Sequence, residues 1–405
     1  MSKIYFDHSA TTPTDPEVLS AILPYFSEKF ANASSVHGYG QEAALAVDQA
    51  RATTAQFFNV SPSEVLFCSG ATEANNLALF GLVKALSGNG INKPHIITSI
   101  LEHDAILEPC KQLELQGLAE LTYLPVNDKG LVELEALQSA IQDNTVLVSI
   151  VYVSSELGTL QPIKQIGRLI EKVNEQRFKA WQALPTGKRL KPATKLYFHT
   201  DATQAINFFT TDFAELKLDM LSLSAHKIYG PKGVGALIAR QSVPLLPLIY
   251  GGHHERNLRS GTINVPGVLG LAKALEIVQR DQEQNNQHLT ELRNYFVSRV
   301  QKEIPNSILN TDLDNSSPAH AHLSFTGASG ESILMALAME AGIAVSTGSA
   351  CANNTSKVSS AILALGLSDS TARSSLRFTF GKNNTRSEVD LLLKVLPDIV
   401  AKFRA

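Results

Sequence analysis

The sequence predicts an α/β protein, with a large domain built on a doubly wound, mostly parallel sheet and a smaller α+β domain after it. Short runs rich in β-branched residues alternate with longer amphipathic stretches, as the crossovers of a parallel sheet require. Several of these runs are apolar on both faces, which is typical of a sheet covered by helices on each side. After about residue 265 a long, Gln- and Glu-rich helical stretch replaces the alternation and indicates a second domain.

The periodicity of the apolar residues and the length of each run predict the individual strands and helices. Strands of the large domain are expected at residues 64–69, 95–100, 121–126, 145–154, 195–201, 219–225 and 235–240. Helices are expected between them at 41–57, 73–86, 104–116, 133–141 and 162–177. The second domain should contain a long helix at 266–303, a helix at 331–340, a last amphipathic helix at 386–403, and the apolar runs "HLSF", "AVSTG" and "SLRFTF".

The predicted large domain comprises residues 14–264, and residues 1–13 join 265–405 in the small domain. The segment 174–195, "NEQRFKAWQALPTGKRLKPATK", is polar, basic and interrupted by Pro and Gly. We interpret it as a long surface loop. A solvated loop is favoured over a contact site for an acidic acceptor protein or tRNA.

Composition excludes several classes of function. A net charge of −3 over 405 residues gives no reason to expect direct nucleic-acid binding or attraction to a membrane. No run approaches the roughly 18 apolar residues of a membrane span, and the N-terminus resembles no signal or transit peptide. The three cysteines, Cys68, Cys110 and Cys351, are too few for a disulfide framework and form no zinc-type pair. A reducing, cytoplasmic location is therefore expected.

Residues that could carry chemistry fall at strand ends, where open α/β sheets bind ligands. In "EVLFCSGATEANNLAL" the turn and helix start, with Thr72, could hold a phosphate, although a capped helix explains the stretch equally simply. "LYFHTDATQA" places Asp201 and Gln204 at another strand end, where a helix cap is the plainer interpretation. "SAHKIYGPKG" places Lys227 at the next strand end, as either a solvated residue or an amine held for chemistry.

A phosphate cradle, a lone carboxylate and a lysine are together what pyridoxal 5′-phosphate requires. Lys227 would form the Schiff base, and Asp201 would keep the pyridine nitrogen protonated. His103, in "ILEHDAIL", could stack on the ring and shuttle protons, although a lone histidine is more often a core or cap residue. Cys351 lies in the small, polar stretch "STGSACANNTS", which suits an exposed, reactive thiol. Cys68 and Cys110 fit packing positions instead.

Motifs over nearly the whole chain support this hypothesis jointly. They are "YFDHSATTP", "SGATEANNLA", "LEHDAIL", "HTDATQ", "SAHKIYGPKG", "HERNLRSGT", "GSAC" and "SSLRFTFG", in this order. Together they resemble the cysteine desulfurases of the NifS/IscS type. These belong to the class V aminotransferase branch of the fold-type I enzymes that depend on pyridoxal phosphate.

The resemblance implies a homodimeric enzyme that converts L-cysteine to L-alanine and leaves a persulfide on the nucleophile Cys351. Lys227 would be the Schiff-base lysine and Asp201 the partner of the ring nitrogen. His103 would stack on the ring as acid and base, and Arg377 would bind the substrate carboxylate. The other implied cofactor contacts are Gln204 at the phenolic oxygen, Ala71, Thr72, Ser224 and His226 at the phosphate, and Thr262 from the neighbouring subunit.

The resemblance also implies that sulfur passes to an acceptor protein, such as an iron–sulfur scaffold or a tRNA-thiolation relay. It implies no resident metal, although Cys351 could ligate an iron–sulfur cluster transiently. Ser155, in "VSSELG", stands where the family has an asparagine that helps to hold the substrate, which leaves substrate choice open. The alternatives are a selenocysteine lyase or a class V aminotransferase of the same fold. A degenerate desulfurase that serves as a binding partner is a further one, against which the intact Lys227, Cys351 and Arg377 argue.

Overall fold

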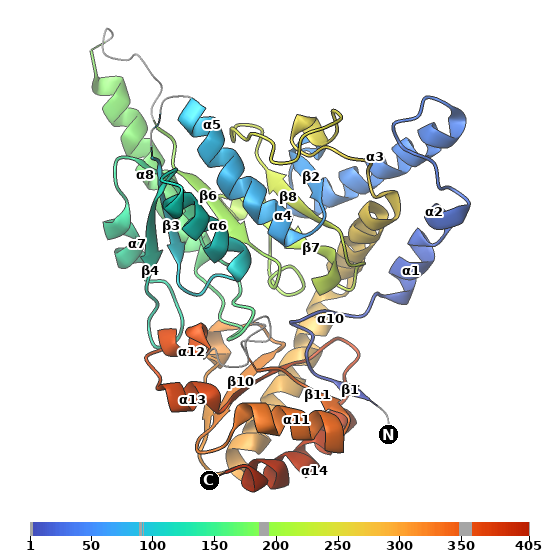
Figure 1. Ribbon diagram of the computed structural model, residues 1–405, viewed down its shortest axis with the longest axis vertical. Helices are drawn as coiled ribbons and strands as arrows, with labels where there is room; N and C mark the ends of the chain where they lie inside the picture. The colour runs from blue at the N-terminus through green and yellow to red at the C-terminus, as the bar shows by residue number, and fades with distance from the viewer. Residues whose placement is uncertain (1–2, 89–90, 92, 186–193, 348–358, 405) are drawn as a thin grey trace.

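The structure is a computed structural model that describes residues 3–88, 91, 93–185, 194–347 and 359–404. Figure 1 shows a helix-covered sheet in the upper part of the molecule and a smaller group of strands and helices below it. The long helix α10 (Val265–Glu303) runs from one part to the other. Within the described ranges, no helix combines the length and the apolar character needed to cross a membrane.

The upper part is built on a seven-stranded sheet with the order β2-β8-β7-β6-β5-β3-β4. Strand β8 runs antiparallel to both of its neighbours, and the remaining neighbouring pairs are parallel. The predicted mostly parallel sheet is therefore confirmed. Its strands are β2 (Val65–Cys68), β3 (His95–Ser99), β4 (Glu120–Leu124), β5 (Thr145–Ser149), β6 (Tyr197–Asp201), β7 (Met220–Ser224) and β8 (Gly235–Ala239).

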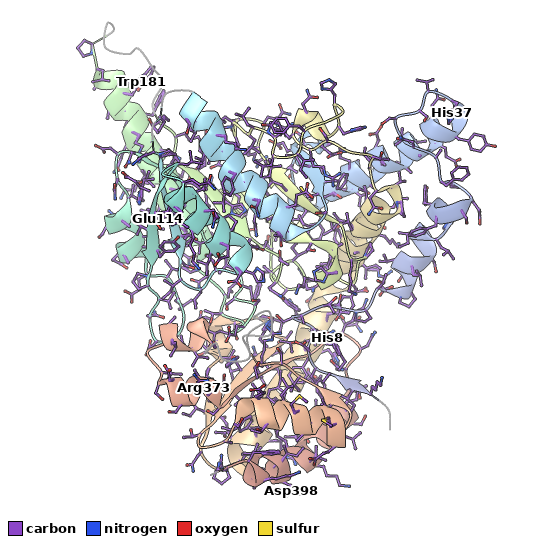
Figure 2. The ribbon with its side chains drawn as sticks, in the orientation of Figure 1. His8, His37, Glu114, Trp181, Arg373 and Asp398 are labelled. Atoms are coloured by element: carbon purple, nitrogen blue, oxygen red, sulfur yellow. The ribbon has the colours of Figure 1, made fainter. Side chains whose placement is uncertain are left out.

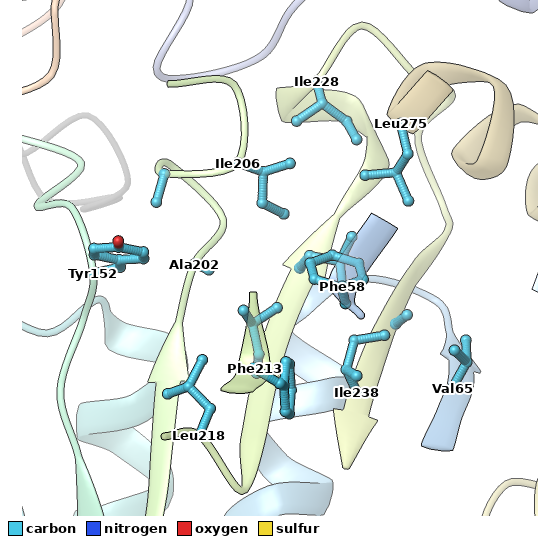
Figure 3. Close-up of a cluster of buried hydrophobic side chains, with 14 of the residues drawn as sticks. Phe58, Val65, Tyr152, Ala202, Ile206, Phe213, Leu218, Ile228, Ile238 and Leu275 are labelled. Carbon is cyan, nitrogen blue, oxygen red and sulfur yellow. The ribbon is translucent and has the colours of Figure 1, made fainter. Parts of the chain in front are cut away.

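Helices cover both faces of this sheet, which explains why all of its strands except β4 are buried along their whole length. On one face, Leu66 and Ile96 pack against the helices that follow β2 and β3. On the other face, Phe198 and Ile238 pack against the long helices. Figure 3 shows Ile238 in this cluster with Phe58 and Leu275. The helices of this part are α1 (Pro16–Ile22), α2 (Pro24–Ser27), α3 (Gly38–Phe58), α4 (Ala71–Asn76), α5 (Leu82–Gly88), α6 (Asp104–Leu115), α7 (Leu134–Ala140), α8 (Ile163–Ala183) and α9 (Phe213–Leu216).

The lower part has a three-stranded antiparallel sheet, ordered β12-β10-β9, and a parallel pair, β1 with β11. One face of the larger sheet carries Leu323 and Phe378 into a hydrophobic core, and the opposite face is polar and also buried. The elements are β1 (Ile4–Tyr5), β9 (Ser307–Leu309), β10 (His320–Phe325), α11 (Gly330–Glu340), β11 (Ile343–Ala344), α12 (Ser360–Ala364), α13 (Asp369–Arg373), β12 (Ser375–Thr379) and α14 (Arg386–Lys402).

Helix α10 contributes buried side chains to both cores, from Val265 to Val278 in the upper one and from Leu289 to Val300 in the lower one. The division of the chain at residue 264 stays a prediction.

A turn after β5, residues 154–160, hydrogen-bonds to the lower part, where the backbone amide of Ser317 donates to the carbonyl of Gly158 at 2.8 Å. This turn therefore ties the two parts together.

The predicted surface loop over 174–195 is wrong in its first part, because α8 continues to Ala183. Residues 174–183 contain neither Gly nor Pro, so nothing interrupts the helix before Pro185. Arg177 fixes this stretch to the sheet by donating to the backbone carbonyl of Thr145 at 2.8 Å. Figure 2 shows Trp181 at the projecting end of α8. The remaining part of the predicted loop, 186–193, lies outside the described residues.

Candidate active site

A cavity of about 1800 Å³ opens where the parallel strands end and the lower part faces them. Its wall also includes the N-terminal segment, through Asp7 and Ser9, and the start of α12. The structure brings nearly all of the predicted site residues to this wall: Ala71, Thr72, His103, Ser155, Asp201, Gln204, Ser224, His226, Lys227 and Arg377. Thr262 is exposed and is not part of the wall. Cys351 lies outside the described residues.

Lys227 follows β7 directly, in a single helical turn over Ala225–Lys227. Its Nζ donates to the backbone carbonyl of Ser9 and, at 2.6 Å, to that of Ala10. The amine is therefore held inside the cavity by the N-terminal segment. The Nε2 of Gln204 donates to the same Ser9 carbonyl at 2.9 Å, which places both side chains at one point of the wall.

Asp201 ends β6 with its carboxylate buried and oriented. Its Oδ2 accepts from the Nδ2 of Asn75 at 2.7 Å, and its Oδ1 accepts from the backbone amide of Thr203 at 3.0 Å. Asn75 is fully buried on α4. A carboxylate with two fixed donors keeps one orientation, so it can present the same edge to a bound ring nitrogen.

The turn between β2 and α4 forms a tight part of the wall beside Ser224. A Cβ at Gly235 would lie 2.3 Å from the carbonyl oxygen of Leu223 and 2.7 Å from the Cα of Gly70, so only glycine fits there. This close approach places the start of the helix at Ala71 next to the end of β7. Burial and the charge of Lys227 lower the pKa of the neighbouring His226 to about 4. The wall here offers backbone amides and hydroxyls, which is the donor set that suits a phosphate.

His103 caps the N-terminus of α6, and its Nδ1 accepts from the backbone amide of Ala105 at 3.0 Å. In the neutral ring, the proton is therefore carried by Nε2. The side chain is exposed to the cavity. His103 is thus both a cap residue, as the simpler interpretation had it, and a group that can exchange a proton in the cavity.

Arg377, on β12, reaches the cavity from the lower part of the molecule. Its Nη2 donates to Oδ1 of Asp7 at 2.7 Å and its Nη1 to the backbone carbonyl of Ser155 at 3.0 Å. The Nε is buried and has no partner among the described residues. Ser155 thus contacts Arg377 through its backbone, which an asparagine at this position would also provide.

Sequence reasoning assigned no role to the buried Glu102, which lies in the cavity wall beside His103. Its Oε1 accepts from the backbone amide of Val151 and the hydroxyl of Ser99, both at 2.8 Å, and burial raises its pKa to about 8. The other residues missed are Asp7, Ser9, Asn75 and Glu156. Several of them belong to the motifs that carry the family resemblance, and this was the only signal available for them.

The two described cysteines have the packing role that was predicted. Cys68 and Cys110 are buried and unpaired. Burial raises the pKa of both thiols, that of Cys110 to about 12, so neither is a reactive thiolate at neutral pH. Within the described ranges, no group of three His, Cys, Asp or Glu side chains is placed to hold a metal ion.

Comparisons with known proteins identify the family and its relatives. The class V aminotransferase family model matches residues 4–177 and 180–392. A curated relative from Dictyoglomus turgidum, "Cysteine desulfurase IscS", is 40% identical over 402 residues, which cover 99% of this chain and 95% of the relative. A solved "NifS-like protein" superposes with a TM-score of 0.88 at 34% identity, covering 99% of this chain and all of the other. "SspA in complex with cysteine" is 32% identical with a TM-score of 0.77, covering 95% of this chain and all of the other.

Proposed function

The chain belongs to the class V aminotransferase family, and from that premise we propose that it is a cysteine desulfurase that uses pyridoxal 5′-phosphate. One observation carries the proposal: Asp201 at the end of β6, Lys227 after β7 and Arg377 on β12 all line one cavity. The relatives named above as desulfurases align over nearly the whole chain. One of the similar structures was solved with cysteine.

The residues of the cavity fit the coenzyme. Lys227 supplies an amine for its covalent attachment, and Asp201 a buried carboxylate for the ring nitrogen. Gln204 would donate to the ring oxygen. The phosphate would lie against Ala71, Thr72, Ser224 and His226. Pyridoxal phosphate, when bound, withdraws electrons from the α-carbon of an amino acid and so weakens the bonds around it.

The protein's own groups do the remaining work. Arg377 binds the substrate α-carboxylate through its charged, planar fork. Lys227 or His103 takes the α-proton and later returns a proton to the carbon that has lost sulfur. The substrate carbon–sulfur bond breaks as a sulfur–sulfur bond forms at Cys351. L-Cysteine and a thiol thus become L-alanine and a persulfide, with no external oxidant.

We further propose that the enzyme is a homodimer whose partner completes the phosphate site through Thr262. The loop that contains Thr262 touches the segment before α3, where the hydroxyl of Ser34 and Nε2 of His254 lie 3.0 Å apart. That segment and its neighbours expose large apolar side chains, a feature of subunit interfaces. They include Leu23, Phe26, Phe30, Val36, Tyr39, Leu45 and Tyr250.

The persulfide sulfur would pass to an acceptor protein, either an iron–sulfur scaffold or a tRNA-thiolation relay, in the cytoplasm. Cys351 could ligate an iron–sulfur cluster transiently during such a transfer. Thiol-to-thiol transfer of this kind requires an exposed cysteine. With Cys68 and Cys110 both buried, Cys351 is the residue to which we assign this role.

The test is an absorbance spectrum of the purified protein with and without L-cysteine, followed by mass analysis of the peptide that contains Cys351. We expect a coloured protein, formation of alanine and a mass increase of about 32 Da, one sulfur atom, on Cys351. Cys351→Ala should keep the colour and lose at least a hundredfold in sulfide release. Undiminished turnover by this variant would show that the nucleophile is assigned wrongly.

A further inference from the structure

Arg377 is already paired with a carboxylate before any substrate arrives. The contact between its Nη2 and Oδ1 of Asp7 is 2.7 Å long, and only 6% of the Arg377 side chain and 17% of the Asp7 side chain are exposed. Both residues line the cavity. Since the pair is shielded from water, salt and solvent screen its charges only weakly. The carboxylate of a ligand must therefore bind to a guanidinium whose charge is largely balanced.

Among the residues that the structure describes, Arg377 is the one cation that pairs with Asp7. Burial lowers the pKa of the adjacent His8 to about 4, so its ring is neutral at pH 7. Burial and the charge of Asp7 both raise the pKa of Tyr5. Tyr5 is therefore also neutral, and the Asp7 charge faces the cavity with Arg377 as its described counter-charge.

A second carboxyl group, Glu156, lines the same cavity and interacts with Arg377. Its Oε1 accepts a hydrogen bond from the hydroxyl of Ser359 and lies 3.7 Å from Nε2 of His322. Burial raises the pKa of Glu156, while Ser359 and Arg377 act in the opposite direction. Arg377 therefore interacts with two acidic side chains, of which only Asp7 forms a direct ion pair with it.

The fork of Arg377 still has donors to offer. A guanidinium carries five N–H donors, and its Nε has no partner among the described residues although it is buried. Asp7 accepts one N–H from Nη2 and the Ser155 carbonyl one from Nη1, so one N–H remains on each of these nitrogens. An α-carboxylate can bind to them while Asp7 stays in place. A ligand with a second negative charge would bring that charge close to Asp7 as well, because a charged group attached to the β-carbon of an amino acid stays near its α-carboxylate.

We propose that Asp7 is a specificity-determining residue, which orients Arg377 and selects amino acids with an uncharged side chain over those with an anionic one. This inference rests on the proposed function, in which Arg377 binds the substrate carboxylate. The thiol of L-cysteine is neutral at pH 7, because its ordinary pKa is about 8.5. L-Aspartate has a similar size and carries the second charge, so it is the matched probe.

The experiment measures dissociation constants of L-alanine and L-aspartate by calorimetry, with the coenzyme-loaded protein and again with coenzyme-free protein. Wild type should prefer L-alanine. In Asp7→Asn, which keeps an oxygen acceptor for Arg377 but removes the charge, we expect the preference to shrink at least tenfold. Asp7→Glu retains the charge and should keep the preference within threefold. Asp7→Ser serves as a second charge-removing variant if Asp7→Asn folds poorly.

Asp15→Asn is the matched control, because Asp15 also forms a buried ion pair, with Lys382, but does not line the cavity. Its preference and its turnover of L-cysteine should equal those of wild type. An unchanged preference in Asp7→Asn, the same loss in Asp7→Glu, or no binding of either amino acid to wild type would overturn the proposal. Binding is measured without turnover, so a failure to form alanine and sulfide would count against the proposed desulfurase activity alone.

Discussion

At the scale of single residues, Glu102 is a buried carboxyl group whose pKa is raised to about 8, chiefly by burial. The folded protein therefore keeps a proton on Glu102 between about pH 4.5 and 8, where the unfolded chain has lost it. Stability must then fall as the pH rises through this window. Glu102→Gln keeps the acceptor for Val151 and Ser99 and removes the titration. Relative to wild type, it should gain roughly 2–3 kcal/mol in unfolding free energy between pH 5.5 and 8.

Urea unfolding of the coenzyme-free protein at the two pH values measures this difference. Parallel stability curves for wild type and Glu102→Gln would show that Glu102 is ionised in the folded state.

Some contacts of single residues could not be predicted from the sequence. Ser155 was noted as a departure in its side chain, yet it contacts Arg377 through its carbonyl, which no residue identity reveals.

At the scale of elements, the turn 154–160 depends on close packing against β10. Gly158 has φ +75°, and a Cβ there would lie 2.4 Å from the Cβ of His320. Gly158→Ala should therefore cost about 3 kcal/mol or more, from backbone strain together with overpacking. Gly117, with φ +66° and open space around it, is the control. Gly117→Ala should cost only about 1 kcal/mol. Equal losses of the two variants in urea unfolding would show that the turn can shift away from β10.

The elements themselves were largely predictable, because alternation and two-sided apolar strands specify a doubly wound sheet. The sequence could not show that β8 runs antiparallel, since strand direction depends on the connection and not on the strand's own residues. The prediction from the sequence was wrong at residues 174–183, because their polar composition suggested a loop. Without a breaker before Pro185, the helix continues.

At the scale of the whole molecule, the site joins residues that are hundreds of positions apart. The Lys227 amine is held by the carbonyls of Ser9 and Ala10, and Arg377 pairs with Asp7. Family resemblance brought Lys227 and Arg377 together in the prediction. The N-terminal segment that links them carried no local signal of its own, because its contacts with Lys227 are made by backbone atoms.

The whole molecule also buries neutral histidines, which should make it sensitive to acid. Burial lowers the pKa of His199 to about 4, and burial with the charge of Arg377 lowers those of His320 and His322 to about 3. The unfolded chain takes up these protons near pH 6.5 and the folded one does not. The buried histidines therefore make their full contribution to stability above pH 6.5, and this contribution is lost as the pH falls below that value. Glu102 opposes this trend, since its folded state gains relative stability on acidification.

Together with His8 and His226, whose pKa values are also lowered to about 4, five histidines act against one glutamate, so wild type should lose unfolding free energy between pH 7 and 5.5. Glu102→Gln removes the opposing group, so its loss should exceed that of wild type by about 2 kcal/mol. The double variant His320→Gln/His322→Gln lacks two of the buried histidines, so its loss should be smaller than that of wild type by roughly 2.5 kcal/mol. Urea unfolding of the coenzyme-free proteins at the two pH values distinguishes the three cases. If all three lost the same amount, the acid sensitivity would have to come from other groups, such as the paired carboxylates.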